Sequence, residues 1–317
     1  MTLPARSIPV SEGTTLSPAC RGGLAIVADG ARLARPRIAL MVLATVASAA
    51  WITSAGKIDP EALLAVLLGT LAVAASSSIA NQILERDIDR LMPRTAGRPI
   101  AAGRLGVREA WAVAVVLLVV GAAITLRAGG AVATLAAVVT WVLYVAAYTP
   151  LKRLTPLNTA VGAVAGALPV AIGWGAAGGP ARLAEGDVAG ALAVGALATV
   201  LYLWQFPHFM AIAWLYRGQY AAAGLRMLPV VDPGGLRVAG QALAAALAML
   251  PVSLLVAVPS GSVPLFLVAA AASSAYVAAT IRFAVRRDDQ SARGLLLTSL
   301  GSLLAILVAA VVCGRSI

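Results

Sequence analysis

Long apolar runs, separated by charged or glycine- and proline-rich segments, make up most of the chain. A helix needs about 20 apolar residues to cross the hydrocarbon core of a bilayer. Because backbone polar groups must be satisfied within lipid, such runs predict membrane-spanning helices. We expect an all-α integral membrane protein with nine transmembrane helices. The predicted spans are residues 37–55, 61–81, 109–126, 130–148, 157–176, 188–210, 238–258, 263–283 and 293–313.

Composition supports this prediction and excludes one function class. The 317 residues are 61% hydrophobic and 12% charged, whereas soluble domains carry about 25% charged residues. The net charge of +11 would also suit a nucleic-acid-binding protein. Here the arginines sit between apolar spans rather than on one soluble face, so we expect no nucleic-acid partner.

The distribution of basic residues orients the predicted helices. All but four of the 24 basic residues lie in the N-terminal segment or beside the connections after even-numbered spans. The four others are Lys57, Arg127, Arg182 and Arg315. The positive-inside rule therefore predicts a cytoplasmic N-terminus and a periplasmic C-terminus, in the cell inner membrane. Residues 1–34 are polar and irregular, so we expect a disordered cytoplasmic tail before a nine-helix membrane domain over residues 35–317.

The densest charge follows the second span, in NQILERDIDRLMPRTAGRP, residues 81–99. Asn81, Glu85 and Asp89 have the spacing i, i+4, i+8, which stacks side chains along one face of a helix. Mg²⁺ prefers oxygen ligands and commonly bridges to substrate phosphates. The arginine fork matches phosphate oxygens, and the arginines that follow are Arg90, Arg94 and Arg98. The stretch predicts a metal–diphosphate site; the alternative is a salt-bridged loop at the membrane surface.

Two further clusters lie on the same predicted face. In YTPLKRLTPLN, the Tyr148 phenol and Lys152 ammonium, with Arg153 adjacent, could reach a leaving diphosphate or could simply anchor the loop. In WQFPHFMAIAWLYRGQYAAAGLRMLPVV, His208 is the only histidine of the chain. It is either a packed core residue or an iron ligand, proton carrier or substrate contact. Its aromatic neighbours could line a flat or polyisoprenoid substrate or form an interfacial belt.

Together these motifs resemble the protoheme IX farnesyltransferases, or heme O synthases, a branch of the UbiA superfamily of membrane prenyltransferases. The residues that carry the likeness are the 81–99 stretch, YTPLKRLTPLN followed by GAVAGALP, and WQFPHF with AGLRMLP. Arg35-Pro36-Arg37 resembles the family's entry to its first helix. The likeness runs from about residue 33 to the C-terminus.

The resemblance implies nine helices around a central cavity, in the UbiA-type fold. It implies transfer of a farnesyl group from farnesyl diphosphate to a vinyl group of heme B, with addition of water, giving heme O and diphosphate. Mg²⁺ would be the cofactor. Expected partners are these two substrates, membrane lipids, and heme A synthase or oxidase assembly proteins.

The resemblance also implies roles for individual residues. The catalytic residues would be Asp89, Glu85, Lys152 and Tyr148, and the metal ligands Asn81, Glu85 and Asp89. The diphosphate would be bound by Arg90, Arg94, Arg98, Lys152 and Arg153. Heme or other substrate contacts would come from His208, Trp204, Gln205, Tyr220 and Asn158.

One position departs from the family pattern. Heme-branch sequences usually carry an acidic residue just before the tyrosine of YxxAG, and here that residue is Gln219. Either one metal site is weaker, or Asp232 substitutes, or this copy has drifted. The alternatives to heme farnesylation are prenylation of a quinone precursor or other aromatic acceptor, heme binding without catalysis in assembly, and transport. Charges gathered on one face and no ionisable pair at the midplane argue against a transporter.

Overall fold

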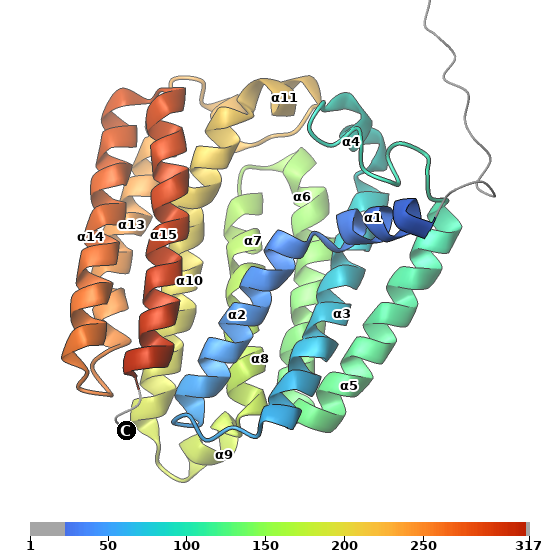
Figure 1. The fold of residues 1–317 in the computed structure, drawn as a ribbon. Coiled ribbons are helices and arrows are strands. Elements are labelled where there is room, and N and C mark those ends of the chain that lie inside the picture. Colours follow the sequence, from blue (N-terminus) through green and yellow to red (C-terminus); the bar gives the residue numbers. More distant parts are fainter. Residues whose placement is uncertain (1–22, 315–317) are drawn as a thin grey trace, which may run out of the picture.

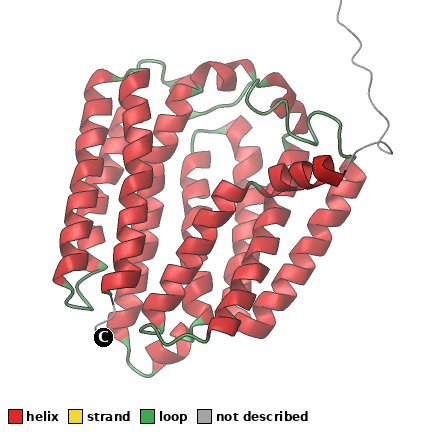
Figure 2. Ribbon diagram, viewed as in Figure 1, coloured by secondary structure: helices red, strands yellow, loops and turns green. Residues whose placement is uncertain are grey.

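The computed structural model describes residues 23–314, and within that range every regular element is a helix (Figures 1 and 2). The long helices run side by side and pack into one bundle (Figure 1). Short helices join them at both ends. The long helices or helix pairs are α2 (Pro36–Thr53), α3 (Pro60–Leu84), α5 (Val107–Val142), α7 and α8 (Asn158–Ala167 and Pro169–Ala176), α10 (Val188–Leu215), α13 (Leu236–Leu255), α14 (Val263–Arg286) and α15 (Asp289–Cys313).

Eight continuous helices in residues 23–314 are long and apolar enough to cross a membrane, so the chain is a multi-pass membrane protein. The predicted count was nine. The difference lies in Val107–Leu154, a 48-residue helix that is about twice as long as a bilayer requires. Its backbone leaves helical geometry at Gly130, where φ is 77° and ψ is −177°.

Contacts of Ser76 in α3 show that this long helix folds back on itself. The Ser76 hydroxyl donates to the carbonyl of Ala114, before Gly130, at 2.7 Å. It also accepts from Trp141 Nε1, after Gly130, at 2.9 Å. The two arms therefore lie on the same part of α3, and they correspond to the predicted spans 109–126 and 130–148. In Figure 1, α1 and the end of α15 lie at opposite ends of the bundle, as an odd number of crossings requires.

The last twelve residues of the predicted disordered tail, Gly23–Ala34, form helix α1 instead. This helix is tied to the bundle through the Leu33 carbonyl, which accepts from Ser78 Oγ at 2.6 Å and Gln82 Nε2 at 3.0 Å. Leu33 itself packs against a buried apolar cluster that includes Ile79 and Ile100. These contacts offset the cost of ordering the segment. The rest of the predicted tail, residues 1–22, lies outside the described residues.

Short helices gather at one end of the bundle, and they bring the motif-bearing loops together. They are α4 (Arg86–Leu91), α6 (Thr149–Leu154), α11 (Arg217–Ala222) and α12 (Leu228–Val231), whereas α9 (Gly179–Ala184) lies at the other end. Ile88 and Met92 pack in one buried cluster with Ala223, Leu225 and Met227. The loop after α3 and the loop after α10 therefore form one cap.

Candidate active site

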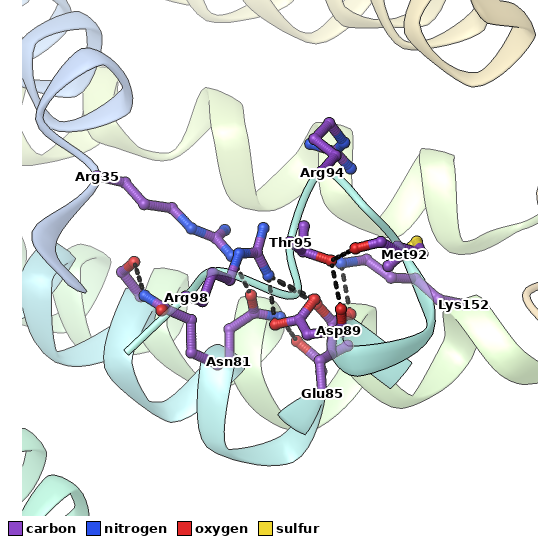
Figure 3. Close-up of polar contacts among 12 residues, drawn as sticks. Arg35, Asn81, Glu85, Asp89, Met92, Arg94, Thr95, Arg98 and Lys152 are labelled. Atoms are coloured by element: carbon purple, nitrogen blue, oxygen red, sulfur yellow. Dashed lines mark hydrogen bonds and ion pairs between the residues drawn. The ribbon is translucent and has the colours of Figure 1, made fainter. Parts of the chain in front are cut away.

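The predicted alignment of Asn81, Glu85 and Asp89 is present in the structure (Figure 3). Asn81 lies in the last turn of α3, Glu85 between α3 and α4, and Asp89 in α4. The backbone hydrogen bonds Glu85 N to Asn81 O at 2.9 Å and Asp89 N to Glu85 O at 2.7 Å continue the helical register across the junction. We call these three side chains the acid ladder. They are only 0%, 7% and 0% exposed, so the alternative of a solvated surface loop does not describe them.

Each member of the ladder is held by a different cation. Arg35 Nη2 donates to Asn81 Oδ1 at 2.9 Å, and Lys152 Nζ donates to Glu85 Oε1 at 2.8 Å. Arg98 Nη1 donates to both oxygens of Asp89, at 2.7 and 2.6 Å. These contacts bring together basic residues from three separate segments of the chain at one site.

Arg35 is a site residue whose contacts the sequence pattern did not reveal. It links α1 to α2 with a left-handed φ of 48°, an uncommon conformation for a residue with a β-carbon. Its Nη1 also donates to the Tyr144 hydroxyl at 3.1 Å. Asn81 Nδ2 donates to Thr149 Oγ1 at 3.0 Å. Asn81 therefore has both ends of its amide bonded within the protein, as expected of a positioning residue.

Tyr148 and Lys152 come together because the helix widens before them. Residues Leu143–Tyr148 form a π-helical turn, a feature often found at functional sites. The Lys152 ammonium lies 4.3 Å from the centre of the Tyr148 ring, and that ring stacks on Tyr144 with 5.4 Å between centroids. A β-carbon at Gly162 would lie 2.8 Å from the Tyr148 ring. The glycine therefore makes room for the tyrosine.

The two carboxylates differ in their electrostatic surroundings. Burial alone would raise the pKa of Glu85, but Lys152, Arg35 and Arg98 together bring it below its ordinary value. Burial raises the pKa of Asp89, and Arg98 offsets only part of that effect. Burial lowers the pKa of Arg98 in turn. The negative charge of Asp89 is thus less fully balanced by nearby cations than that of Glu85, and a bound metal ion would stabilise it.

The other predicted diphosphate ligands separate into those near the ladder and those turned away from it. Arg90 donates to the Ala101 carbonyl at 2.8 Å, so it fixes its own loop. Arg94 Nη2 donates to the Tyr220 hydroxyl at 3.4 Å and its guanidinium lies 4.7 Å from the centre of the Tyr216 ring. Arg94 thereby connects the loop after α3 with α11. Arg153 is exposed.

Four of the predicted substrate contacts make their hydrogen bonds outside the ladder. Trp204 Nε1 donates to the Ser299 carbonyl at 2.7 Å, and the Trp204 ring stacks on His208 with 4.5 Å between centroids. Both therefore face α15. Gln205 Nε2 donates to the Ala163 carbonyl of α7 at 3.0 Å. Asn158 is fully buried, and its Nδ2 donates to the Thr155 carbonyl at 2.7 Å.

The hydrogen bonds of Ser299 determine the tautomer of His208. Ser299 Oγ donates its only proton to the Leu296 carbonyl at 2.6 Å. It must then accept the bond that joins it to His208 Nδ1 at 2.7 Å. The tautomer with the proton on Nδ1 is the one that satisfies both of these bonds at once. Its Nε2 keeps a lone pair and has no hydrogen-bond partner within residues 23–314.

The structure also decides one option for the missing acid. Asp232 Oδ2 accepts from the backbone N–H groups of Arg237 at 2.7 Å and Val238 at 3.2 Å, so it caps the start of α13. This use of Oδ2 argues against Asp232 as the replacement for an acid at position 219. The Gln219 Oε1 atom is buried and has no hydrogen-bond partner in the described part of the chain. It is an unsatisfied acceptor in the cap.

The donor set of the ladder fits a hard cation. It offers carboxylate and amide oxygens, the ligands that Mg²⁺ prefers. Among residues 23–314, no three histidine, cysteine, aspartate or glutamate side chains are grouped closely enough to hold a metal by themselves. Glu85 and Asp89 would provide the carboxylate ligands, Asn81 stays the predicted amide ligand, and water and oxygens of a phosphorylated substrate would fill the remaining positions.

Comparison with solved structures identifies the fold. The chain superposes on a structure from work on digeranylgeranylglyceryl phosphate synthase in membranes with a TM-score of 0.74 and 16% identity, covering 92% of this chain and 99% of that one. It superposes on a UbiA homolog from Archaeoglobus fulgidus bound to GPP and Mg²⁺ with a TM-score of 0.63 and 18% identity, covering 89% and 99%. At these identities the likeness establishes the fold alone.

Sequence comparison identifies the family. Residues 41–312 match the UbiA prenyltransferase family. The chain is 38% identical over 284 residues to the protoheme IX farnesyltransferase of Rhodopirellula baltica, covering 87% of this chain and 96% of that protein. It is 38% identical over 288 residues to the one from Solibacter usitatus, covering 86% and 93%. The chain therefore belongs to the UbiA prenyltransferase family and, within it, groups with the protoheme IX farnesyltransferases.

Proposed function

We propose that this protein transfers a farnesyl group from farnesyl diphosphate to a vinyl group of heme B, with addition of water, and so makes heme O and diphosphate. The observation that carries the proposal is the buried acid ladder, in which each side chain is bonded to a cation (Figure 3). Such a cluster suits a leaving diphosphate. The acceptor is inferred from the names of the relatives that are 38% identical to this chain.

The chemistry requires the C–O bond of the prenyl diphosphate to break heterolytically. Mg²⁺ held by Glu85 and Asp89 would neutralise charge that develops on the leaving group. Lys152 and Arg98 are hydrogen-bonded to these carboxylates. From there they can donate to phosphate oxygens as the C–O bond breaks. The vinyl group supplies the electron pair that forms the new C–C bond. Water then adds to the resulting cation, and the proton that it loses can pass to the diphosphate.

We further propose that the acid ladder lies on the cytoplasmic side of the cell inner membrane. The basic residues beside the ladder favour that side by the positive-inside rule. The ladder residues lie at the end of α3 and in α4, and α4 lies at the same end of the bundle as α1 (Figure 1), which agrees with a cytoplasmic N-terminus. A diphosphate substrate from the cytoplasm would then reach its site without crossing the membrane.

The proposal is tested with Asp89→Ala in membranes supplied with heme B, farnesyl diphosphate and Mg²⁺, with products identified by mass. The matched control is Asp87→Ala, since the Asp87 side chain is 70% exposed and pairs with Arg86 outside the ladder. We expect wild type and Asp87→Ala to form a heme heavier by one farnesyl group plus one hydroxyl group, and Asp89→Ala to form none. A folded Asp89→Ala variant with near wild-type turnover would refute the site. Consumption of farnesyl diphosphate only with a different aromatic acceptor would refute heme B.

A further inference from the structure

The ladder is bonded to cations that come from three distant segments. Arg35 precedes α2, Arg98 lies in the loop after α4, and Lys152 belongs to α6. They hold Asn81, Asp89 and Glu85, respectively. Every ladder oxygen named in these contacts already accepts a bond from a protein cation. The remaining ladder oxygen, Glu85 Oε2, lies 4.0 Å from Arg98 Nη1. A metal ion bound by both carboxylates would therefore have to displace or share the bonds to Asp89.

The charge of the cluster makes a lone metal unfavourable. Three cations face two carboxylates, so the directly bonded groups carry a net charge of +1. A divalent ion alone would raise this to +3 at a site where Asn81 and Asp89 are fully buried, and burial strengthens repulsion between like charges. A diphosphate ester carries roughly three negative charges above its last pKa, near 6. One Mg²⁺ with one diphosphate therefore neutralises the cluster.

We infer that the ladder takes up metal and diphosphate together rather than the metal first, and that Arg35, Arg98 and Lys152 exchange ladder oxygens for phosphate oxygens in that step. This inference rests on the proposed diphosphate substrate. It adds Arg35 to the residues that bind the diphosphate. Guanidinium groups are suited to the exchange, because the same fork matches a carboxylate or a phosphate. The carboxylates of Glu85 and Asp89 are released for the metal in the same step.

The exchange predicts strong coupling between the two ligands, which is measured on the full chain in detergent. Mn²⁺ serves as the metal probe, read by electron paramagnetic resonance as the protein-bound fraction after dialysis, and inorganic diphosphate is the second ligand. We expect Mn²⁺ to bind at least about tenfold more tightly with diphosphate present, and diphosphate to gain affinity from Mn²⁺ by the same factor. Mn²⁺ affinities within twofold of each other with and without diphosphate would overturn the inference.

Removing one protein cation distinguishes two roles for it: exchanging carboxylate for phosphate oxygens, or only holding the folded structure together. Arg98→Gln frees Asp89, so it should bind Mn²⁺ alone more tightly than wild type and lose most of the coupling. Arg98→Lys keeps the charge and should bind Mn²⁺ alone as weakly as wild type.

The control is Arg217→Gln, because Arg217 pairs with Asp289 at 2.7 Å, outside the ladder. Lys152→Gln repeats the test at Glu85 and guards against misfolding of one variant. Folded variants that bind Mn²⁺ alone no better than wild type would refute the exchange.

The binding measurements and the product assay can refute the exchange and the proposed function separately. Coupled binding without a prenylated heme would keep the exchange and refute the proposed acceptor. A prenylated heme formed by a protein that binds Mn²⁺ equally well without diphosphate would keep the proposed function and refute the exchange.

Discussion

Lys152 and Glu85 form a buried ion pair, with 2.8 Å between Nζ and Oε1, although they are 67 positions apart in the chain. The pair fixes α6 against the end of α3. It also places the only lysine of the cap beneath the ring of Tyr148, at 4.3 Å from its centre. An ammonium group in this position can exchange its bond to a carboxylate for a bond to a leaving diphosphate. The first prediction rests on this exchange.

Lys152→Met should lower turnover of prenyl diphosphate by about 10²- to 10³-fold, the usual effect of removing one donor from a charge-stabilising site. Lys152→Arg keeps the charge but not the shape of the ammonium, so it should recover part of the rate. Rates are measured from the mass-resolved product in membranes, normalised to folded protein. A Lys152→Met variant within threefold of wild type would show that the ion pair is structural only.

Gly162→Ala tests whether the position of the Tyr148 ring matters. The added β-carbon would lie 2.8 Å from that ring, so the ring must move and its contact with Lys152 must change. We expect turnover to fall by about tenfold, because displacements of about 1 Å are costly in preorganised sites. Gly240→Ala in α13 has nothing within 4 Å of the new carbon and serves as the control. Equal rates for the two variants would contradict the assigned role of Tyr148.

Local periodicity predicted the spans and the acid ladder, since both depend on residues close in sequence. Asn81, Glu85 and Asp89 had to align once the helical register continued through the α3–α4 junction. The same periodicity could not give the partners of the ladder. Arg35 reaches Asn81 across 46 positions and Tyr144 across 109. Such contacts depend on how the helices pack, for which the spacing of residues in the chain carries no signal.

Other differences have local causes that the pattern concealed. The two spans predicted on either side of Gly130 are the two arms of one long helix, and what the pattern did not show is that a single non-helical residue joins them. Asp232 looked available as a metal ligand, but it is used to cap α13. Trp204 and His208, which were predicted as substrate contacts, bond to Ser299 of α15, a partner that the sequence pattern did not indicate. Each depends on a hydrogen-bond partner or a backbone angle rather than on residue type.

Ser299→Ala tests whether the tautomer of His208 matters for heme. Without the Ser299 hydroxyl, His208 Nδ1 loses its acceptor, so the ring can carry its proton on either nitrogen. One hydrogen bond contributes about 0.5–1.5 kcal/mol. We therefore expect heme B, titrated through its Soret band, to bind about two- to twelvefold more weakly, while affinity for inorganic diphosphate is unchanged.

The matched control for Ser299 is Ser302→Ala. Ser302 lies in the next turn of α15 and donates to the Ala272 carbonyl at 2.9 Å, without contacting His208. It should leave the heme titration unchanged. Equal heme affinity in Ser299→Ala and Ser302→Ala would exclude a role for the His208 tautomer in heme binding.

Gly130→Ala tests the fold-back of the longest helix. At φ 77° and ψ −177°, Gly130 occupies a backbone region that is essentially restricted to glycine, where another residue costs about 1–3 kcal/mol. We expect a lower midpoint of thermal unfolding in detergent. Gly195→Ala is the control, because Gly195 lies inside α10, with open space around its would-be β-carbon. That change should be neutral or stabilising, since alanine favours a helix interior by about 0.5–1 kcal/mol. If Gly130→Ala were as stable as wild type, the turn would not depend on this backbone conformation, and α5 would have to adopt another geometry at that point.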